Sequence, residues 1–103
     1  MTKTVLLDAD KARNLKFSSN QIIELEDKLG RSMMEMDGNM SFKDLRTMVY
    51  VGLKWEDSEL TLEQTGEIMD AVIEKHGMEE LSKKIGVAVK KAFGGKAQPP
   101  SEK

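Results

Sequence analysis

Apolar and polar residues alternate near the N-terminus of the chain. Val5 and Leu7, and then Leu15 and Phe17, have the period of two that is typical of a half-buried strand. A polar segment separates the two pairs, so we expect a β-hairpin within residues 3–17. Because a single hairpin is only marginally stable in water, we expect it to lie on an apolar surface made by the rest of the chain.

After the hairpin, apolar residues recur every three or four positions, which predicts helices. Two candidate helix starts carry capping-box patterns, namely Ser18-x-x-Gln21 and Thr61-x-x-Gln64. A third, Ser41-x-x-Asp44, has the pattern of an N-cap followed by an acidic first turn. Gly30, Gly77 and Gly94 supply the stops. We therefore expect helices over about residues 19–29, 42–55, 62–76 and 78–93. The residues expected to face inward are Ile22, Leu25, Leu29, Leu62, Ile68, Met69, Val72, Ile73, Leu81, Ile85, Ala88, Val89, Ala92 and Phe93.

The second predicted helix is apolar on most of its sides, so we expect it to be central or to present a second apolar face. The fold class expected is mainly α: an N-terminal β-hairpin, a compact four-helix domain and a disordered C-terminal tail. With 103 residues the chain is long enough for one domain, which we place at 1–95. Residues 96–103 contain almost nothing apolar, which predicts the disordered tail.

Composition narrows the function classes. The chain has no Cys and one His, which argues against thiolate catalysis, zinc-thiolate sites and most enzymes. We expect no cofactor and no metal. The segment at 33–44 resembles a calcium loop around Gly38, but its first position is Met33, which offers no oxygen ligand. There is no apolar stretch of about 20 residues and no apolar signal core, so no membrane partner or export is expected.

Charge is distributed unevenly. Residues 24–80 carry 15 acidic and six basic side chains, whereas residues 81–103 carry six basic and one acidic. The basic C-terminal segment is compatible with a regulatory adaptor or a nucleic-acid-associated protein. It lacks, however, the aromatic residues on which bases stack. Lysines near the end of a helix also complement the helix dipole, so nucleic acid is the less favoured partner.

Four of the eight methionines lie between residues 33 and 40. Methionine adapts to irregular apolar surfaces and is common at binding surfaces, although some of these residues could instead cover the core. Trp and Tyr are frequent interface anchors, with the core again as the alternative. The predicted partner-binding residues are Met33, Met34, Met36, Tyr50 and Trp55.

The order of segments adds a family resemblance. The pattern at 16–30, the helix at 41–53, the segment at 60–70 and the final amphipathic helix ending at 92–94 together resemble the tail assembly chaperones of long-tailed phages and gene transfer agents. The resemblance implies a non-enzymatic protein that binds the tape-measure protein and helps recruit tail tube protein during tail morphogenesis. It also implies a place in the host cytoplasm and absence from the mature virion, with self-association left open.

Overall fold

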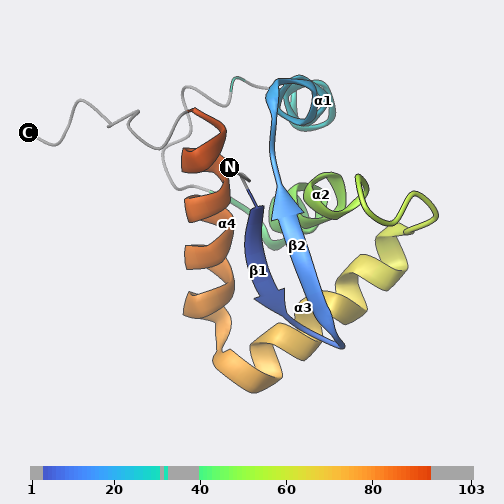
Figure 1. Cartoon of the computed structure of the whole chain (residues 1–103), viewed down its shortest axis with the longest axis vertical. Coiled ribbons are helices and arrows are strands. Elements are labelled where there is room, and N and C mark those ends of the chain that lie inside the picture. Colours follow the sequence, from blue (N-terminus) through green and yellow to red (C-terminus); the bar gives the residue numbers. More distant parts are fainter. Residues whose placement is uncertain (1–3, 31, 33–39, 94–103) are drawn as a thin grey trace, which may run out of the picture.

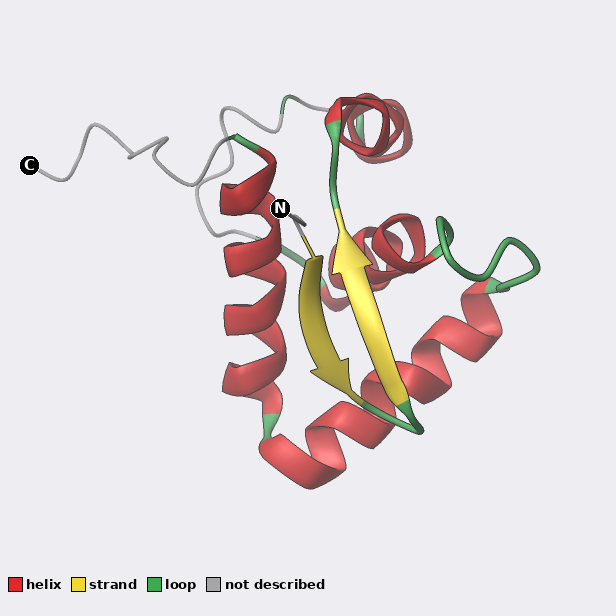
Figure 2. Cartoon of the chain, in the orientation of Figure 1, coloured by secondary structure: helices red, strands yellow, loops and turns green. Residues whose placement is uncertain are grey.

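The computed structural model describes residues 4–30, 32 and 40–93; the tail predicted at 96–103 lies outside them. An antiparallel hairpin is followed by four helices, which confirms the predicted fold class for the described residues. Figure 2 shows the small sheet with the helices arranged around it. The elements are β1 (Thr4–Asp8), β2 (Ala12–Lys16), α1 (Ser19–Leu29), α2 (Phe42–Leu53), α3 (Leu62–His76) and α4 (Met78–Ala92).

The hairpin buries one face and exposes the other, as the alternation predicts. Val5 pairs with Leu15, and both side chains are buried, as are those of Leu7 and Phe17. Leu6 points to the opposite face and is 54% exposed. In Figure 1, α4 runs alongside β1, and α1 lies beyond the end of β2. The helices thus supply the apolar surface that an isolated hairpin lacks.

Helix α2 is the central element of the core. It packs against α1, α3, α4 and β2, which explains why it is apolar on most of its sides. Gly52 lies where α2 approaches the hairpin: a Cβ added there would be 2.8 Å from Leu15 and from Phe17. The largest fully buried side chains are Phe17, Leu7, Leu15, Leu25, Leu53, Met69, Leu81, Val49, Val51, Val72 and Thr65.

The helix starts are those that the capping patterns predict. Both hydrogen bonds of a capping box form at Ser41 and at Thr61, and at Ser18 the backbone N–H donates to Oε1 of Gln21 at 2.9 Å. Gly30 and Gly77 have positive φ angles of 73° and 93° at helix ends. Two details of the prediction are wrong. Helix α2 ends at Leu53 and not at residue 55, because the chain turns there. Leu62 is exposed, because Leu60, just before the N-cap, is the residue that enters the core.

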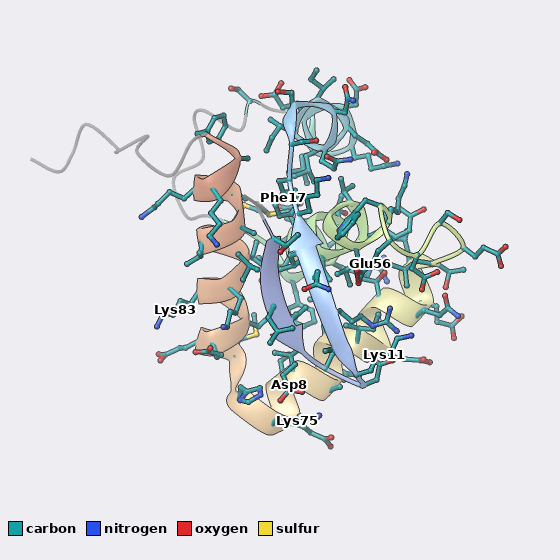
Figure 3. All side chains as sticks on the ribbon, in the orientation of Figure 1. Asp8, Lys11, Phe17, Glu56, Lys75 and Lys83 are labelled. Carbon is teal, nitrogen blue, oxygen red and sulfur yellow. The ribbon has the colours of Figure 1, made fainter. Side chains whose placement is uncertain are left out.

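Two sets of polar contacts fix the turn of the hairpin. The Arg13 guanidinium binds Asp10 with two hydrogen bonds of 2.9 and 2.8 Å and reaches Asp57 at 3.4 Å. On the other side, Asp8 contacts His76 Nε2 at 3.0 Å and Lys75 Nζ at 3.3 Å (Figure 3). The hairpin turn is therefore tied both to the segment before α3 and to the end of α3.

Candidate interaction groove

The groove begins with the first turns of α2. The side-chain oxygen of Ser41 accepts the backbone N–H of Asp44 at 3.0 Å, and the Asp44 carboxylate accepts the N–H of Ser41 at 3.2 Å. This capping box fixes the start of α2 at Phe42. As a result Phe42, Lys43 and Arg46 lie together in the first turns of the helix, and Phe42 is 54% exposed.

Helix α3 provides the second wall. Its start is fixed by Thr61, whose hydroxyl accepts the N–H of Gln64 at 3.1 Å. Glu63, Gly66, Glu67 and Asp70 follow at spacings of three and four, so they share one face of the helix. Gly66 leaves that face open: the nearest atom to an added Cβ would be Cδ of Arg46, at 4.0 Å.

Between the two walls lies an open groove of about 580 Å³, which we call the α2–α3 groove. Its apolar part consists of Phe42 and the buried Met69. Cationic side chains line it from α2 and carboxylates line it from α3. The lining residues are Phe42, Lys43, Arg46, Glu63, Gly66, Glu67, Met69 and Asp70. The volume is within the usual range of about 300–1,000 Å³ for ligand sites.

Arg46 is the unusual member of this groove. Its Nε atom is buried, and among the described residues nothing accepts a hydrogen bond from it. Leaving a buried donor unsatisfied costs roughly 1–3 kcal/mol, and more for a charged group. The groove therefore combines apolar contact area with an arginine whose Nε has no acceptor in the described part of the chain.

A smaller hollow of about 190 Å³ lies next to the groove, and Glu67 lines both. Arg13 and Asp10 dominate this hollow. The hydrogen bonds that Arg13 donates to Asp10 lower the pKa of Asp10 from 3.8 to about 2, and the same bonds raise the pKa of Arg13. Because Arg13 is already fully engaged with Asp10 and Asp57, we assign it the structural role of holding the hairpin turn.

Of the five residues predicted to bind a partner, the structure describes two, Tyr50 and Trp55. Met33, Met34 and Met36 are outside the described residues. Tyr50 is half-buried against the core, with Lys54 Nζ 5.3 Å from its ring centroid. Trp55 is 42% exposed and follows α2 in the chain. Neither Tyr50 nor Trp55 lines the α2–α3 groove.

Both aromatic residues have contacts within the chain. The indole N–H of Trp55 donates to the backbone C=O of Asn14 at 2.8 Å, and Lys16 Nζ lies 4.9 Å from its ring centroid. The groove residues Phe42, Arg46 and Gly66 were not predicted as a site. The sequence signal that could have indicated them is the acidic face of α3 interrupted by Gly66.

No family model, curated protein or solved structure matches this chain. Within residues 4–30, 32 and 40–93, no helix has the length and apolar character needed to cross a membrane. The same residues contain no group of three or more His, Cys, Asp or Glu side chains placed to hold a metal ion.

Proposed function

We propose that this chain is a non-enzymatic tail assembly chaperone of long-tailed phages. It binds helices of the tape-measure protein in the α2–α3 groove and helps to recruit tail tube subunits. The proposal rests on the order of segments in the sequence and on one structural observation. That observation is a groove between two helices with apolar residues, rims of opposite charge, and an Arg46 Nε that no residue within 4–30, 32 and 40–93 satisfies.

The groove suits an amphipathic helix. In this binding mode, apolar side chains from one face of the partner helix enter a groove between helices of the receptor. Here an apolar side chain of the partner would contact Phe42 and Met69, and the absence of a side chain at Gly66 would let it come close to α3. A tape-measure protein is a long helical chain with apolar stripes, so it offers many such segments.

The charges on the two walls determine which charged residues the partner helix should carry on either side of its apolar stripe. Lys43 and Arg46 favour a partner helix with carboxylates along one edge. Glu63, Glu67 and Asp70 on α3 favour lysine or arginine along the opposite edge. Like charges placed against either wall would be repelled, so the groove would select helices by the order of charges across their apolar stripe.

A chaperone of this kind must release its client when tube subunits arrive. A single groove of this size supports only weak binding, and many copies on one long polymer gain strength from multivalency. Weak individual contacts can be displaced one at a time, so assembly of the tube could proceed along the client without a separate release step.

The alternative, an adaptor that binds nucleic acid through its Lys-rich end, gains less support. Lys84 lies 3.7 Å from Glu80, and Lys91 donates to the C=O of Thr4 at 3.3 Å. Lys83 points away from the hairpin on the outer side of α4 (Figure 3). Phosphate binding needs several clustered cations, and two of these lysines already contact groups of the chain itself.

The test substitutes two helical glycines, one that lines the groove and one that lies outside it. Gly66→Leu fills the groove, whereas Gly86→Leu changes α4, where an added Cβ would meet nothing within 4 Å. Both changes raise helix propensity by a similar amount, so their effects on folding are matched. Each variant is co-expressed with the protein encoded by a very long open reading frame directly downstream of the gene.

Wild-type protein and Gly86→Leu are expected to keep the client in solution and to co-purify with it. Gly66→Leu is expected to bind at least about tenfold more weakly, which corresponds to a loss of about 1.4 kcal/mol. If Gly66→Leu and Gly86→Leu retain the client equally well, the groove is not the binding site. If the neighbourhood of the gene contains no long open reading frame of this kind, the tail assembly proposal fails altogether.

A further inference from the structure

The hairpin has two edges, and hydrogen bonds reveal how each is oriented. Leu6 of β1 pairs with Asn14 of β2. The backbone N–H of Asn14 donates to Glu56 at 3.2 Å, and its C=O accepts from Trp55 at 2.8 Å, so both groups point away from β1. Leu6 and Asn14 therefore form a non-hydrogen-bonded pair. The N–H and C=O of Leu6 must then point away from β2, toward the outer edge of β1.

The two edges are protected differently. At the edge of β2, Trp55 and Glu56 occupy the backbone groups of Asn14; Glu56 also accepts from the side-chain amide of Asn14 at 3.3 Å (Figure 3). At the edge of β1, Lys91 reaches the C=O of Thr4. Between the two ends of β1, no described residue binds the backbone N–H or C=O of Leu6. Unpaired strand edges of this kind are templates for pairing with another strand.

We propose that β1 pairs with β1 of a second copy of this chain, in antiparallel register centred on Leu6. The result is a two-fold symmetric dimer with a four-stranded sheet. Leu6 is the middle residue of the five-residue strand Thr4–Asp8, so a two-fold axis at Leu6 aligns the two strands over their full length. The two Leu6 residues satisfy each other's N–H and C=O, and their exposed side chains meet on the outer face.

Charge favours a second copy over an unrelated extended segment. In this register Asp8 of one copy lies opposite Thr4 of the other. Lys91 reaches the C=O of Thr4 at 3.3 Å, so its ammonium group lies near the position of the arriving Asp8. The backbone N–H of that Asp8 would take over the C=O of Thr4. Its carboxylate, which already contacts Lys75 and His76 of its own chain, would gain Lys91 as a third cationic partner. Two-fold symmetry forms this pair twice. An unrelated strand could satisfy the backbone of Leu6, but it would not bring an acidic residue to Lys91 at both ends.

There is some space beside β1. A hollow of about 100 Å³ is lined by Leu6, Leu7 and Asp8 of β1, by Val72 and His76 of α3, and by Glu80 and Lys84 of α4. The pairing would extend a two-stranded sheet to four strands, and sheets of more than two strands are more stable. It would leave the α2–α3 groove free, because none of the residues that line the groove belongs to β1. The inference does not depend on the proposed function.

Disulfide trapping tests the register directly, because the natural chain has no cysteine. In the proposed dimer the two Leu6 Cα atoms form a hydrogen-bonded pair about 5.5 Å apart, which is within the range for a disulfide. Leu6→Cys is expected to form a covalent dimer in a glutathione redox buffer. Ile23→Cys is the control: it is 58% exposed on α1 and distant in sequence from β1, and it is expected to cross-link at least about tenfold more slowly.

Sedimentation and hydrogen exchange test the natural interface. Wild-type protein is expected to dimerise with increasing concentration, and exchange of the Leu6 amide is expected to slow in parallel. Leu6→Pro removes this outward N–H without removing a hydrogen bond of the hairpin, and it is expected to abolish the dimer. The proposal is overturned if wild-type protein stays monomeric at NMR concentrations. A dimer in which Leu6→Cys cross-links no faster than Ile23→Cys overturns it equally.

Discussion

Gly52 is the position where adding one methyl group should do the most damage to this fold. It is buried in α2, facing β2. A Cβ at this position would be 2.8 Å from Cδ2 of Leu15 and 2.8 Å from Cζ of Phe17. Both of these side chains are fully buried, so neither can move without displacing its own neighbours. We therefore predict that Gly52→Ala destabilises the protein although alanine favours the helix.

The magnitude follows from a comparison with Gly86 on α4. Alanine is favoured over glycine inside a helix by about 1 kcal/mol, and Gly86→Ala should gain most of this because nothing lies within 4 Å of its added Cβ. Gly52→Ala has the same gain, offset by an overpacking cost of about 1–3 kcal/mol. Subtracting one variant from the other cancels the helix term, so the two should differ in unfolding free energy by about 1–3 kcal/mol.

Urea denaturation of the wild type and both variants measures this difference, with thermal unfolding as a second readout. For a domain of this size, each kcal/mol shifts Tm by about 4–8 °C. Gly52→Ala should therefore melt at a clearly lower temperature than Gly86→Ala. Equal stabilisation by both substitutions would refute the close packing of α2 on the hairpin. Unequal m-values would mean that the denatured states differ, and the comparison would then rest on Tm alone.

Two further predictions concern the polar contacts of the hairpin. The pKa of Asp10 is lowered by Arg13 to about 2 in the folded state, so its contribution to stability is present above about pH 4 and is lost as the pH falls toward 2. In Asp10→Asn the dependence of Tm on pH should be flatter over this window, and an unchanged acid limb would contradict the ion pair. Trp55→Phe keeps an aromatic ring but removes the hydrogen bond to Asn14, so urea denaturation should show a loss of about 0.5–1.5 kcal/mol. No measurable loss would mean that water replaces the indole without cost.

The elements of the fold were predictable because their signals are local. A capping residue such as Ser41 or Thr61 and a stop such as Gly77 act within one helical turn, and the structure places all three at helix ends. The end of α2 was mispredicted because apolar spacing continues to Trp55. Its indole instead bonds to Asn14 of the hairpin, a contact 41 residues away in sequence. Periodicity contains no information about a contact of this kind.

The candidate groove was not predictable for a related reason. Along the sequence, Glu63, Glu67 and Asp70 are indistinguishable from the solvated face of an ordinary helix, and Arg46 is one basic residue among many. The meaning of these residues changes only when α2 packs on α3 and the Nε of Arg46 is buried with no acceptor among the residues that the structure describes. An isolated helix would expose that atom to water at no cost. Because the cost arises from packing, the site is a property of two helices together and of neither sequence segment alone.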